Sequence, residues 1–67
     1  MILVLQDSVT SAPIGEMVAD FVPAVGETFI YLEGEPGEIN YTITKRLSPT
    51  LIRNGEKVIR LRVRVAT

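Results

Sequence analysis

Residues Lys57 to Ala66 read K-V-I-R-L-R-V-R-V-A, and apolar and charged side chains alternate strictly from Ile59 onward. A period of two places alternate residues on opposite faces of a β-strand, whereas a helix would scatter the arginines around its axis. One face of this strand is therefore apolar and the other is basic. The apolar face contains Ile59, Leu61, Val63 and Val65, and the basic face contains Arg60, Arg62 and Arg64. We expect the rest of the chain to cover the apolar face.

The length and composition of the chain limit its class. Its 67 residues indicate a single domain over residues 1–67. A folded chain of this size buries only about 60% of the surface that its unfolded form exposes. The chain has no cysteine, histidine or tryptophan, which excludes disulfides and ordinary zinc or copper sites. We therefore predict no cofactor and no metal site, and expect sheet closure or self-association to compensate for a thin core.

The apolar start of the chain is too short to be a membrane segment. Residues 1–5 read M-I-L-V-L, with no basic residues before them, and Gln6 and Asp7 follow. A membrane-spanning helix needs about 20 apolar residues, and a signal peptide begins with a basic region. We predict no membrane contact and, as the default, a cytoplasmic location.

The two halves of the chain carry opposite charges, although the net charge is only −1. Residues 1–40 contain seven carboxylates and no basic side chain, so their charge is −7. Residues 41–67 contain seven basic side chains and one carboxylate, so their charge is +6. Both halves also contain apolar strand patterns, so neither is a charged tail. We expect them to form two sides of one folded body.

Three further strands are predicted from apolar and aromatic runs. Residues 1–6 form an apolar run without alternation, which is typical of a strand covered on both faces or lying at a subunit contact. Residues 27–32 are rich in aromatic and β-branched side chains, and from Glu38 onward apolar and polar residues alternate. The stretch E-G-E-P-G-E between them, residues 33–38, has the glycines and proline of a turn.

Residues 12–21 allow two interpretations. Four apolar residues follow the spacing of one helical face, and Ser11 could cap a helix that begins near Pro13. These apolar residues are Ile14, Met17, Val18 and Phe21. Gly15, and the position of Val22 before a proline, disfavour a helix, and a strand fits the segment equally well. The sequence leaves the two open.

Asn54-Gly55 is the strongest turn signal in the chain, because a two-residue hairpin needs positive φ at both positions. This turn pairs Arg53 with Glu56. It also places Leu51 opposite Val58 on the basic face of the last strand.

Continued without interruption, the same register would place Leu47 opposite Arg62 and Lys45 opposite Arg64, so it fails beyond Ser48. We therefore predict one extra residue, a bulge, at Ser48-Pro49, since proline cannot donate a ladder hydrogen bond. The repaired register pairs Leu47 with Leu61, Ile43 with Val65, and Arg46 with Arg62.

These elements predict an all-β fold, with one short helix only if residues 12–21 are helical. Short strands joined by tight turns indicate a small antiparallel meander rolled into a five-stranded barrel. In strand number and length the outline resembles an SH3-like barrel. The resemblance is one of architecture, since no stretch of the chain matches a family motif.

Other groups of polar residues do not predict a catalytic site. The acidic stretch 33–38 lacks the spacing of calcium loops, and Glu16 and Asp20 would pair only on a helix and have no partner for proton transfer. The glycines do not follow a phosphate-loop spacing, and no histidine is present to activate a serine. We predict that the protein is not an enzyme and takes no small-molecule substrate.

The basic face is the candidate functional surface. In the predicted register two arginines face each other across the ladder, which is unfavourable unless an anionic group lies over them. Carboxylates from the acidic half, a second subunit or a ligand could supply that group. The candidate partner-binding residues are Arg46, Leu51, Val58, Arg60, Arg62 and Arg64.

The function predicted from the sequence is a non-enzymatic protein-interaction module. It would associate with itself or bind a partner protein, through its strand edges or its arginine-bearing face, with the first or the last strand as the edge. The alternative is a weak nucleic-acid-binding barrel that uses the arginine column. Arginines about 6.7 Å apart along a strand match phosphate spacing, but no aromatic cluster accompanies them for base stacking.

Overall fold

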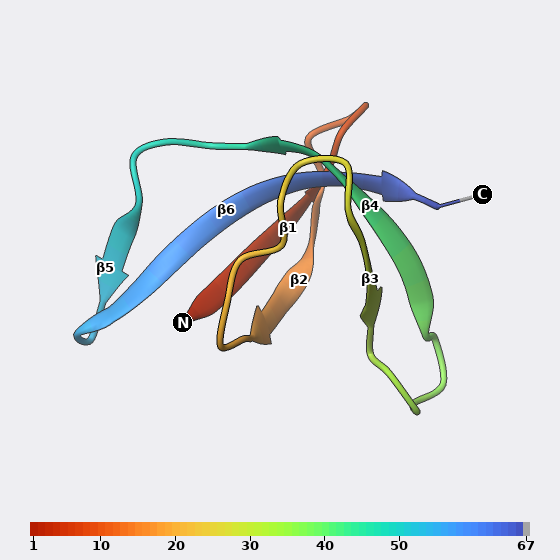
Figure 1. Cartoon of the computed structure of the whole chain (residues 1–67), viewed down its shortest axis with the longest axis horizontal. Coiled ribbons are helices and arrows are strands. Elements are labelled where there is room, and N and C mark those ends of the chain that lie inside the picture. Colours follow the sequence, from red (N-terminus) through yellow and green to blue (C-terminus); the bar gives the residue numbers. More distant parts are fainter. Residues whose placement is uncertain (67) are drawn as a thin grey trace.

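Six β-strands and no helix make up the protein in a computed structural model that describes residues 1–66 (Figure 1). The strands are β1 (Ile2–Asp7), β2 (Pro13–Val18), β3 (Thr28–Tyr31), β4 (Ile39–Arg46), β5 (Leu51–Arg53) and β6 (Glu56–Val65). They form one sheet in the order β2-β1-β6-β4-β3, and β5 pairs with the remaining length of β6. The all-β class predicted from the sequence is therefore confirmed.

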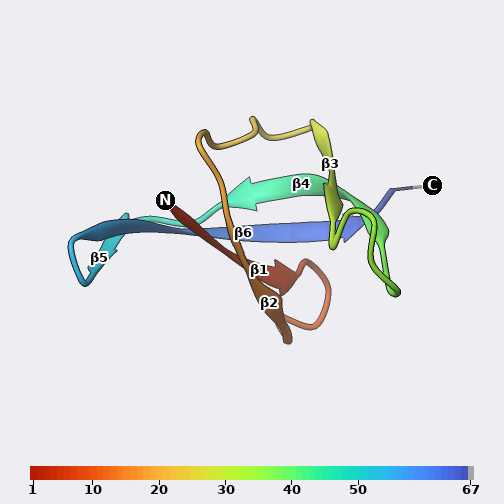
Figure 2. The same ribbon diagram turned by 90° about the horizontal axis from the view of Figure 1, so that it is seen from below.

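The long strand β6 is the centre of the sheet. It pairs in parallel with β1 along one edge and antiparallel with β4 and β5 along the other. The sheet is thus mixed and not a purely antiparallel meander, because the first and last strands of the chain lie side by side. Figure 2 shows the sheet curled into a half-barrel, consistent with the small SH3-like barrel that the sequence predicts.

The core lies on the concave side of this half-barrel. It consists of Leu3, Leu5, Tyr41, Ile43, Ile59, Leu61 and Val63, all buried. Three of the four apolar residues predicted for the inner face of β6 are among them. The fourth, Val65, is 56% exposed, which corrects that prediction. The pairing of β6 with β1 ends at Val63, so Val65 has a strand neighbour only on the β4 side.

Residues 12–21 include a strand and no helix. Residues 13–18 pair with β1 in an antiparallel hairpin, in which Ile14 is the extra residue of a bulge. The predicted helical stripe is not buried as a unit, since Val18 is 79% exposed and Phe21 is 70% exposed. Pairing with β1 satisfies the backbone of the segment and decides in favour of the strand.

The half-barrel is open between β2 and β3, which do not pair. The connection over residues 19–27 crosses the open side, and Ala19 and Val22 pack from it against the core. The side chain of Tyr31 on β3 also reaches across to β2. A methyl group added at Gly15 would overlap the Tyr31 hydroxyl oxygen. The absence of a side chain at Gly15 therefore makes room for the tyrosine that helps to close the barrel.

The pairing of β4 with β6 differs from the predicted register. Arg46 lies opposite Leu61 and Ile43 opposite Val63. Two neighbouring pairs, Arg46 with Leu61 and Leu51 with Val58, enclose four residues (47–50) on one side but only two (59 and 60) on β6. The chain therefore has two extra residues there instead of the predicted one. The sequence also did not reveal a second irregularity, at Thr44. The Thr44 hydroxyl donates a hydrogen bond to the Arg62 carbonyl at 3.1 Å, which offsets the interrupted ladder.

Candidate interaction surface

The face of the sheet turned away from the core, here called the outer face, carries the basic residues of β6. Paired residues lie on the same face, so Val4 of β1 lies beside Arg60 and Gln6 beside Arg62. On the other side of β6, Lys45 of β4 lies beside Arg62. We call Lys45, Arg60 and Arg62 the basic cluster.

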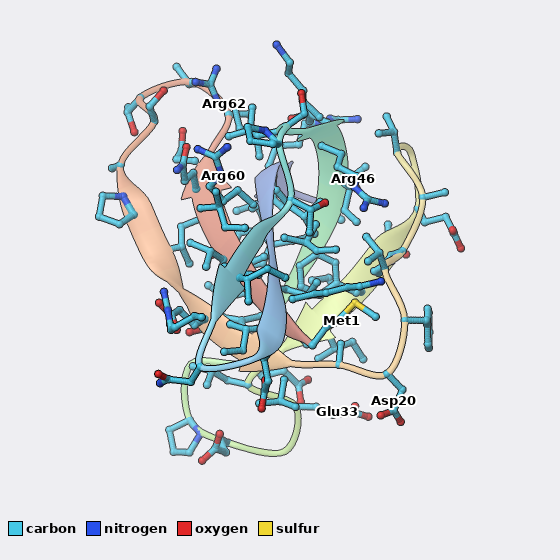
Figure 3. The ribbon with its side chains drawn as sticks, turned by 90° about the vertical axis from the view of Figure 1, so that its left-hand side faces the viewer. Met1, Asp20, Glu33, Arg46, Arg60 and Arg62 are labelled. Atoms are coloured by element: carbon cyan, nitrogen blue, oxygen red, sulfur yellow. The ribbon has the colours of Figure 1, made fainter. Side chains whose placement is uncertain are left out.

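Arg46, predicted to face Arg62, does not belong to this cluster. The segment 47–50 has one more extra residue than predicted, so Lys45 takes the place beside Arg62, while Arg46 pairs with Leu61. The bulge at Thr44 then returns Ile43 to the core face, opposite Val63. Figure 3 shows the Arg46 side chain apart from those of Arg60 and Arg62. Arg64 remains on the outer face opposite Thr42 and is exposed near the end of β6.

Only one residue of the predicted apolar pair on the outer face is exposed. The hairpin register is confirmed, with Leu51 opposite Val58 and Asn54 and Gly55 at φ of 51° and 80°. Leu51 is 42% exposed, but Val58 is 3% exposed and cannot serve as a contact residue. Val58 has Ile2 as its neighbour on its other side. Three adjacent strands thus form an apolar row of Ile2, Val58 and Leu51, and the central residue, Val58, is buried.

An ion pair between Arg53 and Glu16 spans the same end of the outer face. The guanidinium donates two hydrogen bonds to the carboxylate, at 2.8 and 3.2 Å. In the sheet, β6 and β1 separate β5 from β2. In a flat sheet the Cα atoms of Arg53 and Glu16 would be about 20 Å apart, which is farther than their two side chains can reach together. The contact therefore requires the sheet to twist and curl toward its outer face at this corner, which also accounts for the burial of Val58.

The arginines of the basic cluster lack partners for their charge. Within residues 1–66 the only ion pair is that between Arg53 and Glu16. The Arg60 side chain donates one hydrogen bond, to the Pro49 carbonyl at 3.3 Å. The Arg62 side chain donates none to another residue of the described part of the chain, 1–66. The Nε atoms of both are buried without a hydrogen-bond partner among the described residues. A buried donor left without a partner costs about 1–3 kcal/mol. The buried Nε atoms are closed to a second molecule, so an oxyanion would bind the terminal nitrogens of these guanidinium groups through charge-assisted hydrogen bonds.

Carboxylates of the acidic half serve other purposes. Asp7 accepts hydrogen bonds from the backbone of Val9 and Thr10, at 2.8 and 3.0 Å. Glu27 and Glu38 likewise accept backbone hydrogen bonds within their own loops. These acids organise turns and do not neutralise the basic cluster.

Two of the carboxylates, Asp7 and Glu16, make the free energy of unfolding depend on pH. Hydrogen bonds from the Thr10 and Val9 backbone lower the pKa of Asp7, and the Arg53 hydrogen bond lowers the pKa of Glu16. A carboxyl group with a lowered pKa stabilises the fold above its unfolded pKa and loses that contribution as the pH falls through its folded pKa. We expect the free energy of unfolding to decrease as the pH falls below about 4. Thermal unfolding followed by circular dichroism would measure it.

The matched controls for this pH dependence are Glu16→Gln and Asp7→Asn. Each substitution removes one titrating group, so each variant should lose less stability than the wild type over the same pH interval. An unchanged pH profile in both variants would show that neither carboxylate is responsible.

The free edges of the sheet are those of β2, β3 and β5. This corrects the prediction that the first or last strand forms the edge, because β1 and β6 are both interior. Directly after β2, Ala19 exchanges hydrogen bonds with Met1, at 2.9 and 3.0 Å. Antiparallel strands alternate between bonded and non-bonded pairs, so the N–H and C=O groups of Val18 and Glu16 point away from β1. They are available to another strand.

Comparisons of the chain with protein-family models, curated proteins and solved structures found no match. Over residues 1–66, no helix is long and apolar enough to cross a membrane. In the same part of the chain, no three acidic side chains converge as metal ligands would.

Proposed function

We propose that this protein is a non-enzymatic protein-interaction module that binds an extended segment of its partner along the free edge of β2. The observation that carries the proposal is the outward orientation of the backbone groups of Val18 and Glu16. An extended peptide that adds a strand to a sheet uses such groups for main-chain hydrogen bonds.

The side chains at this edge support the same function. Val18 and Phe21 are large, apolar and mostly exposed, and Phe21 follows β2 closely in the chain. Strand addition obtains affinity from the backbone and specificity from side chains that contact alternate residues of the added strand. Exposed apolar groups at the end of β2 provide such contacts.

Replacing Val18 by proline tests the proposal, because it removes an outward N–H while leaving the hydrogen bonds to β1 in place. Edge strands accept proline at positions whose N–H faces outward. Peptides selected from a displayed random library on the wild-type protein should bind Val18→Pro about tenfold more weakly or worse, since a hydrogen bond is lost and the ring obstructs the added strand.

The control is Val18→Thr, which keeps the N–H and the branched shape and should bind the selected peptides nearly as well as the wild type. Amide hydrogen exchange at Val18 and Glu16 should slow when peptide is bound. Equal binding by the proline variant, or a library that yields no binder, would refute strand addition at β2. The cytoplasmic location stays a prediction from the sequence, and fractionation of host cells would test it.

A further inference from the structure

The loop between β3 and β4 presents two carboxylates that the fold does not use. Here the name acidic loop refers to residues 33–38. Backbone hydrogen bonds from Glu35 to Leu32 and from Glu38 to Glu35, at 3.0 and 3.1 Å, shape it. The Glu38 side chain accepts a third bond from the Gly34 backbone at 2.7 Å. Glu33 and Glu35 are exposed and have no ion-pair partner within residues 1–66. The loop therefore holds two free carboxylates on an organised backbone.

The basic cluster has positive charges that no carboxylate of residues 1–66 pairs with. Its two arginines are half-buried and have no ion-pair partner within residues 1–66, and Lys45 adds a third positive charge beside Arg62. The acidic loop of the same molecule does not neutralise it. Figure 3 shows Glu33 at the opposite end of the molecule from Arg60 and Arg62. Only another molecule can bring such carboxylates to the cluster.

We propose that the acidic loop of one copy docks on the basic cluster of a second copy, with the carboxylates of Glu33 and Glu35 bound by Arg60, Arg62 and Lys45. Guanidinium groups bind carboxylates through charge-assisted, often bidentate hydrogen bonds. The opposite charges of the two halves of the chain make copies complementary to each other. A nucleic acid fits less well, because the acidic half would repel its phosphates and no aromatic residue lies in the cluster for base stacking.

Charge reversal in two separate variants tests this contact. The loop variant carries Glu33→Lys and Glu35→Lys, and the cluster variant carries Arg60→Glu and Arg62→Glu. Light scattering should show association of the wild type and only monomers for each variant alone, because loop and cluster then repel. An equimolar mixture of the two variants should associate again, since each copy meets a partner of opposite charge.

Salt dependence provides a second measurement. The Debye length falls from about 10 Å at 0.1 M salt to about 3 Å at 1 M, so wild-type association should weaken at least tenfold over that range. Arg60 and Arg62 are half-buried, so circular dichroism must first show that the cluster variant folds. Lys45→Glu, at an exposed position, is the second cluster variant, and the loop variant changes only exposed residues.

Three results would overturn the proposal: a wild type that stays monomeric, a loop variant that associates as the wild type does, or a mixture of folded variants that stays monomeric. A monomeric wild type that binds a labelled oligonucleotide, and loses it in the cluster variant, would assign the cluster to phosphates instead. The contact does not involve the β2 edge, so Val18→Pro should leave association unchanged. Loss of peptide binding and loss of association are thereby distinguishable.

Discussion

Leu61→Ala is expected to lower the free energy of unfolding by about 2–5 kcal/mol, as large-to-small substitutions in protein cores do. Leu61 is 0% exposed and lies on β6, between β1 and β4, at the centre of the sheet. A domain of this length is stable by only about 3–10 kcal/mol, so one such cavity removes a large part of the total. Urea denaturation followed by far-ultraviolet circular dichroism would measure the change.

Val65→Ala is the matched control on the same strand. The alternation of the sequence assigns Val65 to the same face as Leu61, yet it is 56% exposed, so its truncation should change stability by no more than about 0.5 kcal/mol. If Leu61→Ala does not fold, Ile43→Val tests the same core at a cost of about 0.5–1.5 kcal/mol. Similar losses at Leu61 and Val65 would contradict the central position of Leu61.

The sequence predicted those features of the fold that depend on short-range patterns. The alternation in the last strand identified Ile59, Leu61 and Val63 as core residues, because a period of two belongs to strands alone. Asn54-Gly55 fixed the register of the final hairpin, since few residues tolerate the φ values that this turn requires. Both depend on residues within a few positions of one another.

The features that define the candidate surface depend on contacts that the sequence does not encode locally. The second extra residue in the segment 47–50 shifts β4 by one position from the predicted register and brings Lys45, instead of Arg46, beside Arg62. A shift of one residue exchanges the two faces of a strand, so a small error in register changes the membership of a site completely. Burial of Val58 follows from the curl of the sheet, and the ion pair that marks this curl joins Arg53 to Glu16, far apart in the chain.

The position of the Tyr31 side chain against Gly15, between β3 and β2, predicts that Gly15→Ala lowers the free energy of unfolding. In an unobstructed strand, alanine is more stable than glycine by about 0.5–1 kcal/mol. At Gly15 the new Cβ would overlap the hydroxyl of Tyr31 and lie 3.1 Å from its Cζ. The Tyr31 ring packs against Tyr41, with centroids 6.2 Å apart, and cannot withdraw freely. We therefore expect Gly15→Ala to lower the free energy of unfolding by about 1–3 kcal/mol, as overpacking does.

A double-mutant cycle with Tyr31→Phe identifies the obstacle. Removing the hydroxyl relieves the closest overlap and leaves the tighter-than-usual contact with the ring, so Gly15→Ala should cost less in the Tyr31→Phe background than in the wild type. Residues in direct contact couple by about 0.5 kcal/mol or more. An equal cost in both backgrounds would mean that Tyr31 does not limit position 15. In that case the open side of the half-barrel would be held by the connection over residues 19–27 alone, and stability should then respond to substitutions at Ala19 and Val22, whose side chains pack against the core.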